Sequence, residues 1–464
     1  MNEVILSEPE GQTTPLQPIR PDALEAWLAD RPPMVRALAE TAKFTGKPGQ
    51  VLLLPGEDGG YARALVGFPA DGATDLTALR ALPARLPAGD YVFDDLPEGV
   101  DATDAAVAWA LGAYRFDRYK QKRETPPRLV APEGCDVAQA RARAHASALA
   151  RDMINTPAND MGPLQVETIA REIAEQHGAQ ITVLVGDGLL EGGYPAVHAV
   201  GRAAEAYRAP RMIEIGWGDD AHPRLVLVGK GVVFDTGGLD IKPSAGMRTM
   251  KKDMGGSAHV LALGRMIMAA ALPVHLTILA PVVENAISGD AMRPGDVLAS
   301  RKGLTIEVGN TDAEGRLILA DALARAGELE PDLTIDMATL TGAARVALGP
   351  QVIPFYTADD DLAAALADAA RKVGDPLWRM PLWAGYEDAL DSDIADLKND
   401  PDAWAQAGSV TAALFLKRFA PTDGSWVHFD IFAWNTRGRP GFPSGAEVQA
   451  IHALFEVIRT WYAG

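Results

Sequence analysis

Short apolar runs alternate with amphipathic stretches through the last two thirds of the chain. Apolar runs of strand length occur at residues 181–185, 212–215, 225–228, 275–283 and 333–337. Residues 255–271 and 317–326 place apolar side chains at helical spacing. Residues 297–300 and 304–308 predict a hairpin. Strands that alternate with helices are typical of a mostly parallel, doubly wound sheet.

The first 130 residues carry the pattern of a separate, small N-terminal α/β domain. Strands are predicted at 51–54, 61–68 and 91–93, and a helix at 101–119 with Asp101 or Thr103 as its cap. A proline-punctuated linker follows at 123–134. Residues 136–155 predict one connecting helix, and residues 156–464 then form the larger C-terminal domain of this α/β chain.

The connecting helix carries three arginines, Arg141, Arg143 and Arg151. Basic residues on a helix can mark a partner surface, but they more often form a solvated face. We expect a solvated face here.

Composition narrows the class of protein. Of the 464 residues, 48% are hydrophobic and 23% charged, which is typical of a globular enzyme. The formal charge of −19 disfavours nucleic acid and anionic membranes as partners. A lone cysteine, Cys135, fits a reducing compartment. The start of the sequence does not resemble a signal peptide, and no apolar run reaches the roughly 18 residues of a membrane span, so we expect a cytoplasmic protein.

The candidate chemistry begins in the segment 310–317, between a predicted strand and a predicted helix. It contains Asp312, Glu314 and Arg316. If the segment is extended, the two carboxylates share one face, where they repel unless a proton or cation separates them. The alternative is an acidic first helical turn with Asp312 as its cap. Arg316 offers a planar fork for an oxyanion.

A second polar segment follows the predicted strand at 225–228. It is rich in glycine and carries Lys230, Asp235, Lys242 and Asp253 before the next helix. Ligand sites in open α/β sheets collect beyond the carboxyl ends of strands, so the two segments can bring four carboxylates together. That much buried negative charge needs compensation, and two divalent cations with oxygen ligands would supply it.

Five motifs in these segments resemble the leucine (cytosol) aminopeptidase family. They lie at residues 228–231, 234–238, 241–243, 253–256 and 310–317, in the family's order and approximate spacing. The resemblance covers about residues 140–464. It implies an enzyme that uses a two-metal-activated water to hydrolyse N-terminal amino acids from peptides with a free N-terminus. Residues 156–464 would then be the catalytic aminopeptidase domain.

The resemblance also implies roles for individual residues. Two metal ions per chain, Zn²⁺ and/or Mn²⁺ with Mg²⁺ or Co²⁺ as further options, would be held by Lys230, Asp235, Asp253, Asp312 and Glu314, with Asp235 and Glu314 bridging them. Lys242 would stabilise the oxyanion, and Arg316 would hold bicarbonate as a general base. Lys230 must be neutral to ligate a metal; from the residues alone it can equally be a salt-bridge partner of the carboxylates.

The family positions that line the pocket for the first side chain correspond to Met250, Thr339, Leu340 and Gly342. From pattern alone, residues 338–343 are also a simple strand-to-helix turn. The sequence departs from the family at Phe432, where relatives carry a small residue. We expect Phe432 to narrow this pocket, unless it points into the core. The family further implies a homohexamer.

Three other functions are alternatives to this one. They are a catalytically silent family scaffold, a DNA-binding accessory protein, and a two-metal phosphoesterase. The intact motif residues argue against the first, and the acidic charge argues against the second. The chain has no His-Glu-x-x-His motif, no complete phosphate loop and no Gly-x-Ser-x-Gly elbow.

Overall fold

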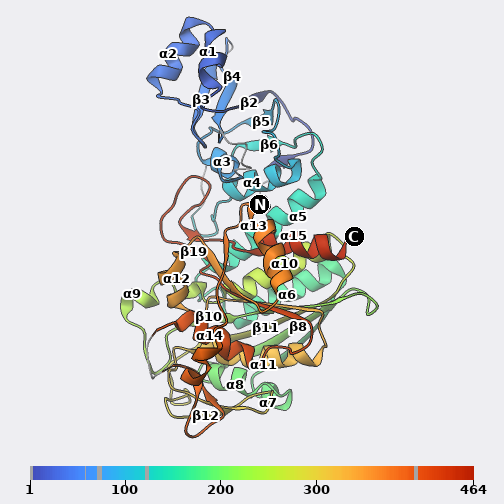
Figure 1. The fold of residues 1–464 in the computed structure, drawn as a ribbon, viewed down its shortest axis with the longest axis vertical. Helices are drawn as coiled ribbons and strands as arrows, with labels where there is room; N and C mark the ends of the chain where they lie inside the picture. Colours follow the sequence, from blue (N-terminus) through green and yellow to red (C-terminus); the bar gives the residue numbers. More distant parts are fainter. Residues whose placement is uncertain (1–3, 58, 70–75, 121–124, 402–405, 464) are drawn as a thin grey trace. The chain divides into compact units, whose positions relative to one another are not determined.

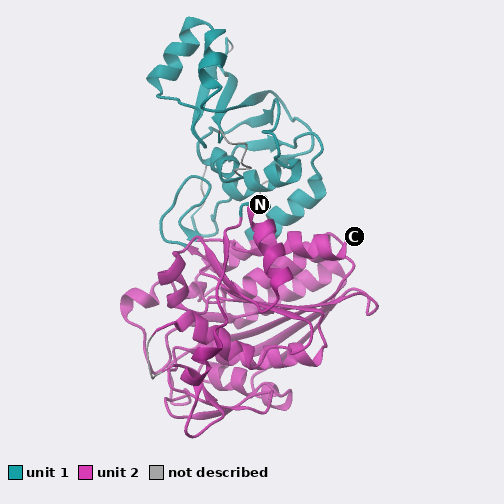
Figure 2. Cartoon of the chain, in the orientation of Figure 1, with its two compact units in different colours: residues 1–148, 372–374, 435–445 teal, residues 149–371, 375–434, 446–464 magenta. Residues whose placement is uncertain are grey.

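The computed structural model describes residues 4–57, 59–69, 76–120, 125–401 and 406–463, which form two compact units (Figures 1 and 2). Unit 1 comprises residues 1–148, 372–374 and 435–445, and unit 2 comprises residues 149–371, 375–434 and 446–464. The first crossing between them falls within the helix α5 (Val137–Asn155). Within the described residues, no helix combines the length and apolarity needed to cross a membrane.

Unit 1 is built on a six-stranded sheet in the order β1-β6-β5-β2-β4-β3. Its strands are β1 (Ile5–Leu6), β2 (Thr13–Ile19), β3 (Val51–Pro55), β4 (Tyr61–Gly67), β5 (Asp90–Phe93) and β6 (Arg128–Val130). Only the β3–β4 pair is antiparallel. The helices are α1 (Leu24–Ala29), α2 (Pro33–Thr41), α3 (Leu76–Ala81) and α4 (Ala102–Ala113). The strands predicted at 51–54, 61–68 and 91–93 are confirmed.

The helix predicted at 101–119 is shorter than expected. Asp101 caps α4 as predicted, because its carboxylate accepts the N–H groups of Thr103 and Asp104 at 2.9 Å. The helix ends at Ala113, because Tyr114 leaves helical geometry with ψ of 136°. Beyond it, the ring centres of Phe116 and Tyr119 lie 6.0 Å apart. The two residues are three positions apart in the sequence, which resembles the spacing of a helix.

Unit 2 contains a nine-stranded, mostly parallel sheet. Its path is β16-β15-β18-β14-β9-β11-β8-β7, and β10 also pairs with β11. The strands are β7 (Gln180–Val185), β8 (Arg211–Trp217), β9 (Arg224–Gly229), β10 (Gly231–Asp235), β11 (His275–Asn285), β14 (Leu333–Ala338), β15 (Ile353–Tyr356), β16 (Leu377–Arg379) and β18 (Ser425–Asp430). All five strands predicted for this part are confirmed, and β8 is antiparallel to both of its neighbours.

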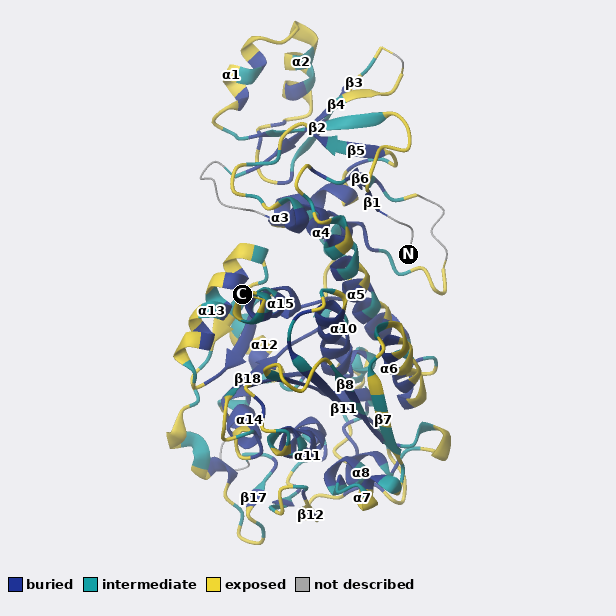
Figure 3. Cartoon of the chain, turned by 90° about the vertical axis from the view of Figure 1, so that its right-hand side faces the viewer, coloured by how far each residue is buried: buried dark blue, intermediate teal, exposed yellow. Residues whose placement is uncertain are grey.

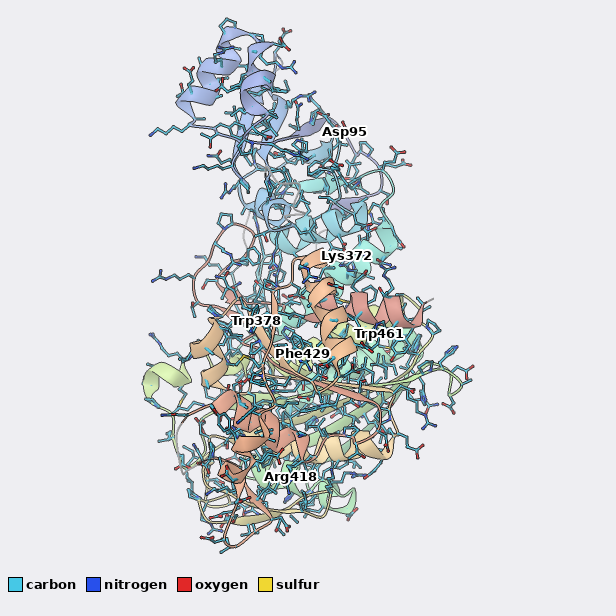
Figure 4. All side chains as sticks on the ribbon, in the orientation of Figure 1. Asp95, Lys372, Trp378, Arg418, Phe429 and Trp461 are labelled. Atoms are coloured by element: carbon cyan, nitrogen blue, oxygen red, sulfur yellow. The ribbon has the colours of Figure 1, made fainter. Side chains whose placement is uncertain are left out.

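Helices cover both faces of this sheet, as the doubly wound pattern predicts (Figure 3). One layer contains α6 (Pro163–His177), α10 (Gly255–Ala269) and α15 (Ile451–Tyr462), which pack around α10. The other contains α8 (Pro195–Gly201), α11 (Glu314–Glu328) and α14 (Gly408–Lys417), which pack around α11. Phe429 on β18 is fully buried and stacks on Phe355 at 5.7 Å, whereas Trp378 on the edge strand β16 is 61% exposed (Figure 4).

Shorter elements complete unit 2. The predicted hairpin is confirmed as the antiparallel pair β12 (Val297–Ala299) and β13 (Thr305–Glu307), to which β17 (Leu397–Lys398) adds in parallel. The remaining elements of the chain are α7 (Gly188–Glu191), α9 (Ser244–Met247), α12 (Gly342–Leu348), α13 (Asp360–Val373), β19 (Trp434–Asn435) and β20 (Gly445–Ala446), with 3₁₀ turns at η2 (Ala206–Arg208), η3 (Met250–Lys252) and η4 (Ala384–Leu390). A further 3₁₀ turn, η1 (Leu82–Ala84), belongs to unit 1.

The expected solvated arginine face on α5 is wrong. Arg143 is buried and pairs with Asp104 in unit 1 at 2.7 Å, and Arg151 is fully buried against Glu447 in unit 2 at 2.7 Å. Arg141 donates to the main-chain oxygen of Ile5 at 2.9 Å. A guanidinium can be buried when a carboxylate compensates its charge, so the charge pattern did not mark the exposed face.

Candidate active site

A cavity of about 540 Å³ in unit 2 lies where several strands end. Its wall includes residues that follow β9, end β10 and follow β14. Eleven of the predicted site residues line it: Lys230, Asp235, Lys242, Met250, Asp253, Asp312, Arg316, Thr339, Leu340, Gly342 and Phe432. Glu314 is not among the lining residues, but it is buried next to three of them. The position beyond the strand ends agrees with the general rule for open α/β sheets.

The local structure of the two polar segments differs from the expectation. The glycine-rich segment contains the strand β10, so Asp235 ends a strand rather than lying in a loop. Glu314 is the first residue of α11, so Asp312 and Glu314 are not neighbours on an extended strand. Asp312 is not the helix cap either, because Ala313 holds that position and no side chain caps it. The turn into the helix brings the two carboxylates together.

Three carboxylates meet at this turn. Oxygen atoms of Asp235, Asp312 and Glu314 all lie within 4.8 Å of one another. Burial, reinforced by the charge of Asp235, raises the pKa of Glu314 to about 8. The same two causes raise the pKa of Asp312 to about 6. The cluster therefore carries more negative charge than its surroundings compensate.

Two lysines supply the local positive charge. The ammonium of Lys230 is 2.8 Å from Asp253 Oδ2 and 2.9 Å from Glu314 Oε1, and it donates to the main-chain oxygen of Thr339 at 3.2 Å. Burial opposes its charge, but the carboxylates of Asp253 and Glu314 prevail and raise the pKa of Lys230. Lys242 lies 2.7 Å from Asp235 Oδ2 and also pairs with Asp312.

The donor set fits divalent cations. Both side-chain oxygens of Glu314, together with Asp253 Oδ2 and Asp312 Oδ1, are buried without a hydrogen bond. In the ion pairs with Lys230 and Lys242, the nearest oxygens are Asp253 Oδ2, Glu314 Oε1 and Asp312 Oδ1. Buried carboxylate oxygens without hydrogen bonds are costly unless a cation ligates them. Oxygen ligands of this kind suit hard or borderline divalent metals.

Two asparagines that sequence reasoning missed position the segments that carry the carboxylates. Asn285 donates to Asp235 Oδ1 at 2.8 Å and to the main-chain oxygen of Thr311 at 3.2 Å. Asn399 accepts the N–H of Gly309 at 2.8 Å and donates to the oxygen of Asn310 at 2.7 Å. Asn285 ends β11, so its place at a strand end was the one available signal.

Arg316 is buried in the first turn of α11 and lines the cavity. One guanidinium nitrogen, Nη1, donates to the main-chain oxygen of Asn399 at 2.7 Å, while Nε has no hydrogen bond. Burial lowers the pKa of Arg316 to about 10, which still leaves it charged at neutral pH. It can therefore offer hydrogen bonds to an anion in the cavity.

The turn from β14 to α12 forms another wall, and its strand-to-helix form was predicted. Thr339 donates from Oγ1 to Asp253 Oδ1 at 2.7 Å. Asp430, at the end of β18, accepts the N–H groups of Leu340 at 3.1 Å and Thr341 at 3.0 Å. These bonds fix the main chain that faces the cavity.

Phe432 lies in the cavity wall, with 9% of its surface exposed. It is also largely buried, so the expected narrowing of the pocket and the alternative of a core position both stay predictions. Two cations of the wall lie over its ring. The guanidinium carbon of Arg345 is 4.8 Å from the ring centre, and the ammonium of Lys252 is 5.2 Å from it. Sequence reasoning named neither cation. Burial lowers the pKa of Lys252.

Comparisons with known proteins identify one aminopeptidase family in both the N-terminal and the C-terminal parts of the chain. Residues 148–454 match the family model described as the cytosol aminopeptidase family, catalytic domain, and residues 14–132 match the M17 aminopeptidase N-terminal domain. The sequence alone had offered no motif for the second match.

Relatives are similar over nearly their full length. The chain is 40% identical over 455 residues to a probable cytosol aminopeptidase of Syntrophotalea carbinolica, covering 90% of each chain. Among solved structures, the cytosol aminopeptidase of Coxiella burnetii has a TM-score of 0.93 and 42% identity, with 99% of each chain covered. The bottromycin maturation enzyme BotP in complex with Mn has a TM-score of 0.85 and 34% identity, with 97% of this chain and 100% of that chain covered.

Proposed function

Because the chain belongs to the cytosol aminopeptidase family, we propose that the cavity in unit 2 is its active site, where two divalent ions take part in removing the first residue of a peptide. The protein is a metal-dependent aminopeptidase, a hydrolase of the exopeptidase class. The observation that carries the assignment of the site is the meeting of Asp235, Asp312 and Glu314 within 4.8 Å.

Five residues would hold the ions: Lys230, Asp235, Asp253, Asp312 and Glu314. The buried, unbonded oxygens of Asp253, Asp312 and Glu314 support this set. Zn²⁺ and Mn²⁺ are the proposed ions, with Mg²⁺ or Co²⁺ as further options; a relative, BotP, has been solved with Mn. When bound, the ions would polarise the scissile carbonyl and activate water. Lys230 would have to lose its proton, which the added positive charge favours.

The chain's own charged groups would stabilise the reaction in two ways. Lys242 would present its ammonium to the oxyanion that develops on the peptide carbonyl. Arg316 would hold a small anion, bicarbonate, that accepts a proton from water. Its Nε, which has no hydrogen bond, supports that role.

The wall around Phe432 would receive the first side chain of the substrate. Met250, Thr339, Leu340 and Gly342 line the same cavity. The hydrogen bonds that Leu340 and Thr341 donate to Asp430 would keep the main chain of this wall in place, so that the peptide is oriented before reaction. The aromatic ring of Phe432 would reduce the space available to large first residues.

Further proposals follow from the family rather than from this cavity. We expect a homohexamer, a cytoplasmic location and peptides with a free N-terminus as the partners, while the charge of −19 disfavours nucleic acid. We also propose residues 1–130 and 156–464 as the two domains, joined by the helix at 136–155.

The decisive experiment is metal removal and return. Purified protein should contain close to two divalent ions per chain by elemental analysis, and chelation should abolish hydrolysis of Leu-p-nitroanilide. Adding ions back one type at a time should restore it. Asp253→Ala and Glu314→Ala should each lose metal as well as rate, whereas p-nitrophenyl phosphate should remain uncleaved throughout. Full peptidase activity in metal-free protein would contradict the proposal.

A further inference from the structure

Five cationic side chains line the cavity, and three of them already have strong partners. Lys230 pairs with Asp253 and Glu314, and Lys242 pairs with Asp235 and Asp312. Arg316 donates to the main-chain oxygen of Asn399. The four carboxylates that form these ion pairs are therefore already paired with Lys230 or Lys242. The other two cations, Arg345 and Lys252, are in a different situation.

Arg345 lies on α12, exposed to solvent at the wall of the cavity. Among the residues that the structure describes, its side chain makes no ion pair and no hydrogen bond. Its contact is with the ring of Phe432, whose centre is 4.8 Å from the guanidinium carbon. An aromatic ring attracts a cation without using its N–H donors, so the guanidinium is positioned while its donors stay available.

Lys252 approaches the same ring from η3. Its ammonium is 5.2 Å from the ring centre, and the nearest carboxylate oxygen in the described residues is Asp253 Oδ1, at 3.8 Å. That separation is too long for a hydrogen bond. Asp253 is in any case paired with Lys230 at 2.8 Å. Both cations thus lie within 5.2 Å of one ring centre, and an anion that reaches them would offset their like charge.

We propose that Arg345 and Lys252, both held against Phe432, bind the side-chain carboxylate of an acidic first residue, so that peptides beginning with Glu or Asp are preferred substrates. The inference rests on the proposed function, which places Phe432 in the wall around the first side chain. In this proposal Phe432 has a second role, because the ring that limits the size of the pocket also positions Arg345 and Lys252. Arg345 offers a fork of donors that matches a carboxylate.

Glu- and Gln-p-nitroanilide test the proposal, because their side chains have nearly the same size and differ in charge. Wild-type enzyme loaded with metal should prefer the Glu substrate in kcat/KM. In Arg345→Gln, the Glu-to-Gln ratio should fall by roughly tenfold to a hundredfold, the usual size of a hydrogen bond to a charged group. The loss should appear mainly in KM, since the contact is made equally in the ground and transition states.

Three further variants separate recognition from general damage. Arg345→Lys keeps the charge without the planar fork and should give an intermediate ratio. Phe432→Leu removes the ring that holds both cations and should also lower the ratio. Arg371→Gln, at an exposed position on α13 outside the cavity wall, makes the same change in net charge and should keep the wild-type ratio. Because each ratio is taken within one variant, a uniform loss of activity cancels.

The outcomes are distinct. An enzyme that cleaves Leu-p-nitroanilide but shows equal kcat/KM for the Glu and Gln substrates, or keeps its ratio in Arg345→Gln, overturns the inference and leaves the proposed function intact. If Arg345→Gln instead changes only the preference for Ala-Gly over Ala-Gly amide, Arg345 binds the C-terminal carboxylate, and the assignment to the first side chain is wrong. No cleavage of any of these amides by metal-loaded enzyme would instead refute the proposed function itself.

Discussion

At the scale of single residues, the site is a balance between burial and compensating charge. Glu314 is almost fully buried, and its pKa is raised to about 8 although Lys230 lies 2.9 Å away. The nearby charge of Asp235 contributes to that shift. A cation of higher charge than an ammonium would stabilise the ionised carboxylate of Glu314 better, and a divalent ion has that higher charge.

Lys242 is the residue whose replacement best separates catalysis from metal binding. Lys242→Ala should keep its metal, because its ammonium pairs with carboxylates but offers none of the oxygen ligands. It should lose about two to three orders of magnitude in kcat, the usual effect of one oxyanion contact. Elemental analysis beside steady-state kinetics measures both quantities. Arg316→Ala serves for comparison, and its kcat should fall less if buffer anions replace bicarbonate. A near-native kcat in Lys242→Ala would show that Lys242 does not stabilise the oxyanion.

The residues that the sequence identified were those that occur in motifs. Asp312 and Glu314 stand two positions apart beside Arg316, and such spacing is visible without a structure. Asn285 and Asn399 act singly, through hydrogen bonds to residues 26 or more positions away, such as Thr311 and Asn310. Arg345 likewise meets Phe432 only in the folded chain. A side chain that acts alone at long range leaves no periodic signal.

At the scale of elements, the apolar runs located the central strands correctly. The strand β10 was missed because its five residues follow β9 after a single residue, Lys230, and begin with glycine, so they resemble part of a loop. The helix α4 was extended too far because aromatic residues continued its spacing. Burial of Arg143 and Arg151 was missed because their partners, Asp104 and Glu447, are distant in sequence.

The turn between β14 and α12 depends on one residue from another element, Asp430 on β18. Its carboxylate accepts two main-chain N–H groups and the hydroxyls of Thr341 at 2.6 Å and Ser409 at 2.9 Å. Asp430→Asn replaces one acceptor oxygen by a donor that faces other donors, so the turn should loosen. We expect kcat/KM to fall roughly tenfold to a hundredfold, with metal content unchanged.

Ser409→Ala is the matched control for Asp430→Asn. It removes one donor to the same carboxylate but leaves both main-chain bonds, so its effect on kcat/KM should be clearly smaller. If the two variants lose the same activity, the bonds from the N–H groups of Leu340 and Thr341 to the Asp430 carboxylate do not position the substrate-binding wall. Elemental analysis and thermal melting of both variants exclude metal loss and unfolding as causes.

At the scale of the whole molecule, long-range contacts decide how the chain divides. Unit 1 includes residues 435–445, far along the chain from its first strands. Within that unit, Arg80 Nε donates to the main-chain oxygen of Gly441 at 2.8 Å, and its guanidinium lies over Phe442 at 3.7 Å. No local sequence pattern predicts such a contact, because the residues around Arg80 and around Gly441 are ordinary for a helix and a turn.

The stability of unit 2 should depend on a histidine that must stay neutral. His259 on α10 is fully buried, and one ring nitrogen, Nδ1, is 2.6 Å from the main-chain oxygen of Gly255. The other, Nε2, accepts the N–H of Gln449 at 3.0 Å, which places the proton on Nδ1. Burial lowers the pKa of His259 to about 4, from 6.5 for the free side chain.

Acid should therefore destabilise the protein through His259. Below pH 6.5 the unfolded chain takes up a proton at this residue while the folded chain does not until about pH 4, so the free energy of unfolding falls across that window. At pH 5 the loss is about 2 kcal/mol, from 1.5 pH units at about 1.4 kcal/mol each. Asp321, whose pKa burial raises to about 6, acts in the opposite direction, since its folded form binds the extra proton.

Comparing variants isolates the histidine from such opposing groups and from metal loss. His259→Gln should be less stable than wild type at pH 7.5, because glutamine cannot reproduce both hydrogen bonds of the ring. Between pH 6.5 and 4 it should lose less further stability than wild type does, since no ring is protonated on unfolding. His222→Gln, at an exposed histidine, should follow the wild-type curve. Chemical denaturation across this pH range measures the difference, and parallel curves for His259→Gln and wild type would show that His259 is not the buried group that acid titrates.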